Sequence, residues 1–112
     1  VARIGEYAFK GCKGLTAINI PNSVTWIHLG VFLGCTGLTS ITIPNSVTQI
    51  EAWAFEDCTS LTSIIIPNSV TIIKSNAFSE NSNLTSIKID KEENSIEDSP
   101  WGASNATVTW LR

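Results

Sequence analysis

The sequence predicts a β-rich solenoid, a stack of short coils that share one continuous core. The tetrapeptide Pro-Asn-Ser-Val recurs at Pro21, Pro44 and Pro67 with a constant step of 23 residues. Apolar residues recur at the same step, and within each repeat two isoleucines stand two positions apart, as on one face of a β-strand. Because a coil of this length cannot bury its own apolar face, neighbouring coils must stack.

The expected core consists of apolar columns that run through the stack. Each column keeps the same residue type from coil to coil, so its side chains should form a ladder. The columns are Ile4, Ile27, Ile50, Ile73 and Ile96; Phe9, Phe32, Phe55 and Phe78, continued by Trp101; Leu15, Leu38, Leu61 and Leu84; Ile18, Ile41, Ile64 and Ile87; and Ile20, Ile43, Ile66 and Ile89.

Residues 38–43 represent the first expected element of each coil. Ile41 and Ile43 point to one side of a strand, whereas the serine and threonine between them point to the other. Pro44 ends the strand, because proline cannot donate to a ladder of parallel strands. After the Pro-Asn-Ser turn comes a second short extended stretch, with Val24 and Ile27 inward. The Ala-Phe pair beyond it predicts a tight turn or a single helical turn, too short for an independent helix.

The repeat defines the domain organisation. We expect a single domain over residues 1–112, in which residues 1–89 form four 23-residue repeats, the first truncated. Residues 90–112 are polar and acidic yet keep Ile96 and Trp101 on their columns, so they predict a degenerate fifth coil that caps the stack. Val108 and Trp110 should form its last strand. The chain starts in the middle of the recurring frame, which predicts a fragment of a larger protein.

Composition excludes several classes of protein. The chain is 43% hydrophobic and 15% charged, which is too apolar for a disordered segment. Its apolar runs are too short to cross a bilayer, so we expect no membrane insertion. The net charge of -3 argues against nucleic acid as a partner, because that partner requires a basic surface.

The repeated pattern L-x-x-I-x-I-P-N-S-V-T-x-I-x-x-x-A-F-x-x-C resembles the leucine-rich repeat of the BspA-like class, also called the Treponema pallidum type. The resemblance covers residues 1 to about 90. It implies a leucine-rich-repeat solenoid of β-rich α/β class, right-handed, with a parallel sheet on the concave side, short strands and turns on the other faces and a C-terminal cap. It also implies a bacterial or protozoan surface or secreted protein, some relatives being similar to adhesins that bind fibronectin or fibrinogen.

The cysteines and the single histidine give little support to a catalytic or metal site. Cys12, Cys35 and Cys58 share one column, continued by Asn81, and are expected to be buried free thiols, since side chains on parallel coils are poorly placed for a disulfide. His28 is the only histidine and lacks an evident nucleophile or orienting carboxylate beyond Glu51 one coil away. We therefore expect no enzyme, no metal and no cofactor.

The acidic run 90–98 partly resembles a calcium loop. Asp90, Glu92 and Asn94 stand at alternate positions, as calcium ligands do. Ser95 replaces the glycine that such a loop needs, and Trp101 replaces its bidentate glutamate. A solvated capping turn is the preferred interpretation.

Comparison of the coils with one another separates scaffold from free positions. Variation concentrates in three outward columns after the turn. They are Arg3, Trp26, Gln49 and Ile72; Gly5, His28, Glu51 and Lys74; and Tyr7, Gly30, Trp53 and Asn76. Trp and Tyr anchor interfaces because they bring large rigid contact area. The expected partner-binding residues are Tyr7, Trp26, His28, Gln49, Glu51, Trp53, Ile72 and Lys74, with Trp26 and Trp53 foremost. The alternative is that these slots vary because nothing constrains them.

The function expected from the residues and the resemblance is non-enzymatic protein binding in a bacterial surface or secreted protein. Adhesion to host or extracellular proteins, a matrix protein among them, is the favoured use, which places the chain outside the cell. The alternative is a structural spacer, the terminal cap of a longer array with no partner of its own. A fixed frame with varied slots is also typical of a laboratory-diversified scaffold.

Overall fold

The computed structural model describes residues 4–92, 95–96 and 101–112. In this part of the chain strands alternate with turns, and no helix is present. The strands are β1 (Ala17–Asn19), β2 (Trp26–Ile27), β3 (Ser40–Thr42), β4 (Gln49–Ile50), β5 (Ser63–Ile66), β6 (Ile72–Ile73), β7 (Ser86–Ile89) and β8 (Thr107–Trp110).

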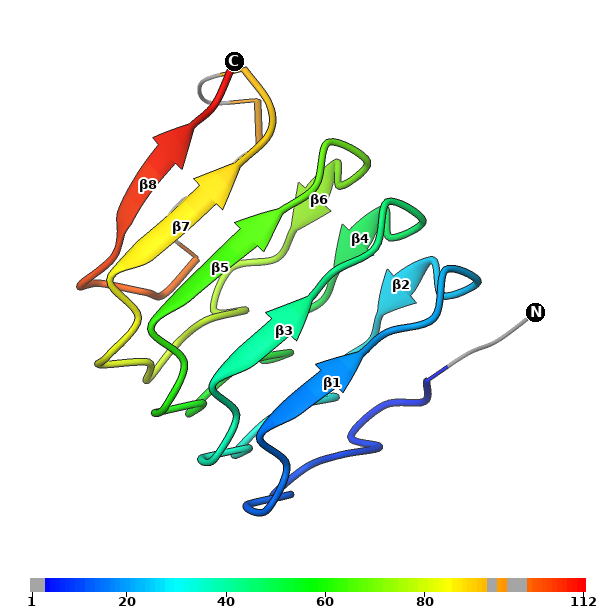
Figure 1. Ribbon diagram of the computed structural model, residues 1–112, viewed down its shortest axis with the longest axis vertical. Coiled ribbons are helices and arrows are strands. Elements are labelled where there is room, and N and C mark those ends of the chain that lie inside the picture. Colours follow the sequence, from blue (N-terminus) through cyan, green and yellow to red (C-terminus); the bar gives the residue numbers. More distant parts are fainter. Residues whose placement is uncertain (1–3, 93–94, 97–100) are drawn as a thin grey trace.

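The strands form two layers that follow the stack of coils. The longer strands β1, β3, β5, β7 and β8 lie side by side along one face, and the short strands β2, β4 and β6 form a second sheet (Figure 1). All pairs are parallel, and except between β7 and β8 the paired residues are 23 positions apart, as Ala17 with Ser40 and Ile27 with Ile50. The chain is therefore a parallel-strand solenoid of about 4 turns, as the 23-residue repeat predicts.

The phenylalanine column forms the centre of the core. Phe32, Phe55 and Phe78 are fully buried, and their rings stack with centroids 5.4 and 5.3 Å apart and interplanar angles of 13° and 8°. Phe9 stacks on Phe32 at 5.7 Å, and Trp101 closes the other end edge-on to Phe78 at 6.3 Å. The ladders predicted from the sequence are thus confirmed for this column.

The fixed Ser-Val-Thr frame has a reason that the sequence pattern did not reveal. The Ser46 hydroxyl donates to the carbonyl of Val24 at 2.7 Å, and the next coil repeats the bond from Ser69 to Val47 at 2.6 Å. The threonine two residues later adds a weaker bond, from the Thr48 hydroxyl to the Thr25 carbonyl at 3.3 Å. These hydroxyls tie each coil to the preceding one, so the frame is constrained by contacts between coils as well as by the turn.

The corner that follows β2, β4 and β6 is built from turns and not from a helical turn. One corner position has positive φ in every described coil, with 57° at Tyr7, 60° at Gly30, 58° at Trp53 and 66° at Asn76. A second such position follows four residues later in each coil, as at Asp57. The chain therefore reverses by repeated left-handed residues, which glycine and asparagine adopt most easily.

The last coil is shorter than the others. Ser86 on β7 pairs with Thr107 on β8, a step of 21 residues where the other pairs have 23. The predicted last strand is confirmed, since β8 contains Val108 and Trp110. The inferred capping role of residues 90–112 stays a prediction, and residues 93–94 and 97–100 of this segment lie outside the described part.

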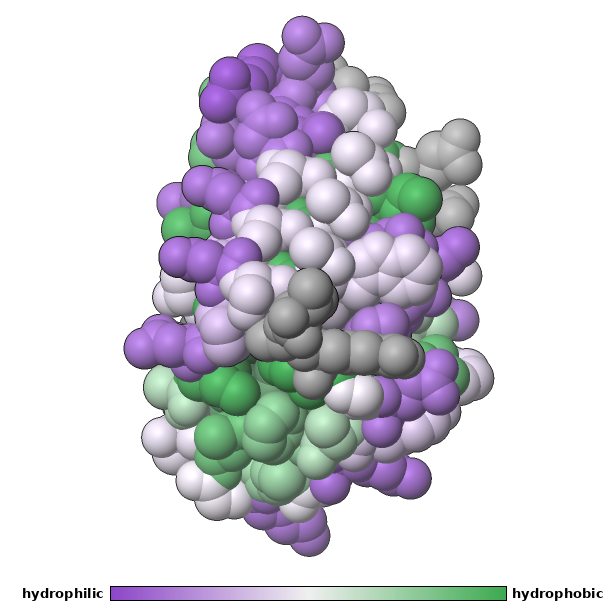
Figure 2. All heavy atoms as spheres, turned by 90° about the vertical axis from the view of Figure 1, so that its right-hand side faces the viewer, coloured by the Kyte–Doolittle hydropathy of each residue, from purple (hydrophilic) through white to green (hydrophobic). Residues whose placement is uncertain are grey.

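The first coil is less well covered than the central ones. Phe9, Leu15 and Ile18 are half-buried, whereas their equivalents Phe55 and Leu61 in the third coil are fully buried. Figure 2 shows apolar side chains gathered toward the end of the molecule where this coil lies. The core is therefore tightest in the central coils, which carry most of the predicted partner-binding residues.

Candidate functional site

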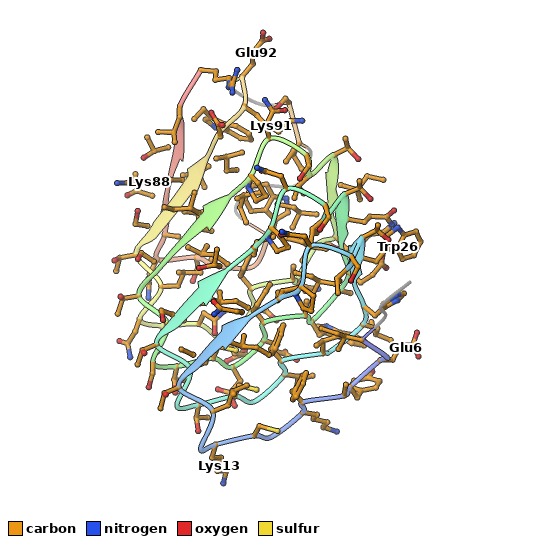
Figure 3. The ribbon with its side chains drawn as sticks, turned by 45° about the vertical axis from the view of Figure 1, so that its right-hand side comes forward. Glu6, Lys13, Trp26, Lys88, Lys91 and Glu92 are labelled. Carbon is orange, nitrogen blue, oxygen red and sulfur yellow. The ribbon has the colours of Figure 1, made fainter. Side chains whose placement is uncertain are left out.

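The sheet of β2, β4 and β6 positions the first outward column. Trp26, Gln49 and Ile72 occupy equivalent places on neighbouring strands, in register. The next residue of each strand, such as Ile27, is buried, because side chains alternate between the two faces of a strand. Trp26 projects away from the ribbon into solvent (Figure 3). Arg3, the predicted first member of the column, lies outside the described residues.

The second column follows directly after these strands. The His28 ring packs beside Trp26, with centroids 5.4 Å apart. Glu51 accepts a hydrogen bond of 2.7 Å from the Gln49 amide nitrogen. Among the described residues His28 makes no ion pair with Glu51, which the sequence had offered as a neighbouring partner. These side chains thus interact mainly within their own coil.

The third column occupies the left-handed corner. Tyr7 lies over Gly30, and a Cβ atom added to Gly30 would collide with the tyrosine ring. Trp53 and Asn76 follow on the next two coils. A bulky residue at positive φ is held at a cost in backbone strain, of order 1 kcal/mol for a residue such as Trp53.

The three columns together form a partly apolar surface, which we call the variable face. Its residues are Tyr7, Trp26, His28, Gln49, Glu51, Trp53, Ile72, Lys74 and Asn76, whereas Gly30 is buried beneath Tyr7. Four of its side chains, Tyr7 (38%), Trp26 (41%), Trp53 (40%) and Ile72 (41%), stand among the few large apolar side chains exposed in the described chain. An accumulation of exposed apolar side chains among polar ones is typical of an interaction surface.

Two surface features were missed by sequence reasoning. The Lys10 ammonium lies 5.5 Å from the centre of the Tyr7 ring, within range of a cation–π interaction. Ile65 on β5 is 62% exposed on the other sheet, which makes it the most exposed large apolar side chain described. Residue 65 belongs to a column that varies between coils, with Asn19, Thr42 and Lys88 at the equivalent places, but its degree of exposure depends on how the strands are spaced.

The cysteine column is structural. All three thiols are free, with Cys35 and Cys58 buried and Cys12 half-buried. The Sγ of Cys35 donates to the Phe9 carbonyl at 3.1 Å, and that of Cys58 donates to the Phe32 carbonyl at the same distance. Desolvation by burial raises the pKa of Cys58 to about 12 and also raises the pKa of Cys35. Buried thiols with raised pKa values are unreactive.

We expect one thiol of the native chain to react with Ellman's reagent at pH 8, and all three to react after unfolding. Cys12 is the accessible one, whereas Cys35 and Cys58 are shielded and protonated. An unfolded thiol ionises near its ordinary value of 9.0, so the free energy of unfolding should be undiminished below about pH 9. It should fall as the pH rises from 9 toward 12. Reaction of all three thiols at the same rate under native conditions would contradict the burial.

No cluster of three or more metal-ligating side chains occurs in the described part of the chain. Asp90, from the acidic run weighed as a calcium loop, instead pairs with Arg112, whose Nε and Nη2 lie 2.8 and 3.2 Å from its two carboxylate oxygens. The hydrogen bond from Arg112 holds the pKa of Asp90 below its ordinary value. Asn94 of the same run lies outside the described residues. The described part of the chain also contains no helix that could span a membrane.

The fold and the repeat define the chain as a leucine-rich-repeat solenoid. The profile of the BspA type leucine rich repeat region matches residues 2–107 in 6 copies. The chain belongs to this family. Comparison with curated protein sequences finds no match.

Several solved structures are similar to the chain. The Treponema pallidum leucine rich repeat protein is 27% identical over 98% of this chain, with a TM-score of 0.76, and 45% of its own length is covered. A leucine rich cell surface protein from Faecalibacterium prausnitzii is 37% identical over 82% of this chain, with a TM-score of 0.70 and 30% of its length covered. The pneumococcal vaccine antigen PcpA shares the fold, with a TM-score of 0.76 at 24% identity, over 82% of this chain and 23% of its own. The chain thus spans less than half the length of these proteins.

Proposed function

We propose that the chain is a non-enzymatic protein-binding module of a bacterial surface or secreted protein, and that it serves adhesion to extracellular or host proteins. The observation that carries the proposal is the exposure of Tyr7, Trp26, Trp53 and Ile72 on the variable face. Their scaffold is tightly packed and repeated, whereas these side chains change from coil to coil. Family membership supports protein binding in general, and one similar structure is described as a cell surface protein.

Binding would proceed by docking onto a preformed surface. β2, β4 and β6 are short, but each rests on fully packed core residues such as Ile50, so the variable face can change little on binding. The molecule measures 34 × 33 × 20 Å, so one face is comparable with the roughly 800 Å² per partner of a standard interface. Aromatic anchors amid polar neighbours such as His28 and Glu51 are the usual composition of such an interface.

The experiment is label-free binding of the immobilised chain to fibronectin, fibrinogen and a panel of other extracellular proteins. The test variant combines Trp26→Gln with Trp53→Asn. Both new residues are taken from the same columns of neighbouring coils, and asparagine suits the left-handed corner. We expect saturable binding to at least one protein and a loss of affinity of about tenfold or more in the variant.

The matched control is Leu111→Ser, which removes an exposed apolar side chain away from the variable face. It should bind the panel as the parent chain does. Equal binding by the parent and the test variant would move the site to another surface. Absence of any saturable binding would favour the structural spacer.

A further inference from the structure

The sheet of longer strands contains a break between its second and third strands. β1 pairs with β3, and β5 pairs with β7 and β8, but among the described residues no ladder joins β3 to β5. Elsewhere on this face the Thr39 and Thr85 amides donate to the preceding coil's threonine carbonyl at 2.9 and 3.0 Å. The equivalent bond from Thr62 to Thr39 is missing from this described region. The break therefore already includes the threonine that directly precedes each strand.

The break is local, because the same two coils are joined elsewhere. Phe32 and Phe55 stack at 5.4 Å, and the amide of Phe32 donates to the Ala54 carbonyl at 2.8 Å. β2 and β4 remain paired on the other sheet. The two coils are thus held at the corner and along the second sheet, and only their longer strands, β3 and β5, are in contact without backbone pairing.

A groove of about 300 Å³ occupies the separation, and we call it the slot. It is lined by Thr39, Ser40, Ile41, Thr42 and Ile43 on one side and by Ser63, Ile64, Ile65 and Pro67 on the other. Ile41 is half-buried here, as is Ile18 in the preceding coil, whereas Ile64 and Ile87 in the two following coils are buried. The slot therefore has an aliphatic floor and hydroxyl-bearing walls, at the lower end of the volumes that hold ligands.

The slot has one positively charged side chain beside it, that of Lys88. Among the outward positions of the five described strands on this face, Lys88 is the only charged residue. It lies beside Ile65 in the register of β5 and β7. Its ammonium group has no hydrogen-bond or ion-pair partner among the described residues, and it points to the opposite side from Trp26 (Figure 3). An unpaired cation next to an aliphatic slot is complementary to a carboxylate next to an aliphatic side chain.

We propose that the slot binds an extended acidic segment of a protein partner, which places an aliphatic side chain between β3 and β5 and a carboxylate on Lys88. Neighbouring strands are about 4.8 Å apart, so the slot and Lys88 are separated by roughly 7 Å. Side chains two residues apart on one face of an extended chain have this spacing. The recognised unit is therefore an aliphatic residue followed or preceded, two positions away, by an acidic one. This surface lies on a different face from the variable face and does not depend on it.

The test is an NMR titration of the full ¹⁵N-labelled chain with the peptide acetyl-Ser-Leu-Thr-Glu-Ser-amide. We expect saturable shifts at the amides of β3, β5 and β7, with a dissociation constant on the order of 1 mM, because one side chain and one exposed ion pair contribute. Replacing glutamate by glutamine in the peptide, or Lys88→Gln in the chain, should weaken binding about threefold. Replacing leucine by serine in the peptide should abolish it.

Thr42→Tyr places a ring at the wall of the slot and should block the peptide. Thr107→Tyr, at an outward position of β8 that pairs with Ser86 and not with Lys88, is the matched control and should leave binding intact. The variant Trp26→Gln, Trp53→Asn should bind the peptide unchanged, so that failure of the slot and failure of the variable face can be told apart. Absence of saturable shifts, shifts confined to the variable face, or undiminished binding by Lys88→Gln would overturn the proposal. Because the Lys88 side chain is exposed, Lys88→Gln should not disturb folding. This variant therefore tests the proposal even if Thr42→Tyr fails to fold.

Discussion

Replacing Phe55 by alanine is expected to lower the free energy of unfolding by about 3–5 kcal/mol, the cost of removing a fully buried aromatic ring. The ring stacks against Phe32 and Phe78 at 5.4 and 5.3 Å, so its loss leaves a cavity between two neighbours that the coils above and below hold in place. Urea denaturation followed by circular dichroism measures the change, with calorimetry as a check for a single transition.

Phe9→Ala is the matched control in the same column. Phe9 is half-buried and has one stacking partner, Phe32, so its removal is expected to cost about 1–2 kcal/mol. The difference between the two variants measures how burial grows from the end of the stack to its centre. Equal losses at Phe9 and Phe55 would contradict a continuous ladder with a tight central part.

Replacing Asn81 by leucine is expected to lower the free energy of unfolding by about 1–3 kcal/mol, the cost of leaving buried backbone groups without partners. Asn81 is the only buried polar side chain among the described residues. Its Oδ1 accepts from the Cys58 amide at 2.6 Å, and its Nδ2 donates to the Phe55 carbonyl at 2.8 Å. The amide side chain therefore joins two coils by hydrogen bonds that a leucine side chain cannot form. Urea denaturation of both chains measures the difference.

Asn81→Cys restores the residue type of the other coils. A cysteine Sγ can donate to the Phe55 carbonyl, as Cys58 does to Phe32, and the Cys58 amide can turn to that carbonyl, as the Cys35 amide does to Phe32 at 3.1 Å. We expect a cost below about 1 kcal/mol. If the cysteine variant were as unstable as the leucine variant, hydrogen bonds to the Phe55 carbonyl would not be what stabilises residue 81.

The fold was predictable because the same apolar residues recur every 23 positions and have to be buried in each coil. Isoleucine and phenylalanine at fixed positions have to be buried against their own equivalents, which sets the stacking direction and the register that pairs Ile27 with Ile50. The hydroxyl bonds of Ser46 and Thr48 were not predicted, because a conserved small polar residue in a turn has several possible roles. The two-residue shortening before Thr107 was also missed, since that segment lacks the repeated motif.

The candidate site was predictable in part. The exposure of Trp26 and Trp53 follows from their places next to buried residues, in columns that tolerate any side chain. The left-handed corner at Trp53 was hidden, because the glycine and asparagine of that column occur in only two of its coils. The break between β3 and β5 was not visible either, since Thr39 and Thr62 are identical in sequence and differ only in their contacts. Which face meets a partner stays a prediction.

Docking of a protein partner on the variable face is tested most directly by amide hydrogen exchange of the chain, measured with and without a panel protein that binds it. We expect slowed exchange in β2, β4 and β6 and at the corner around Trp53. Slowing confined to β3, β5 and β7, or none at any described residue, would contradict it.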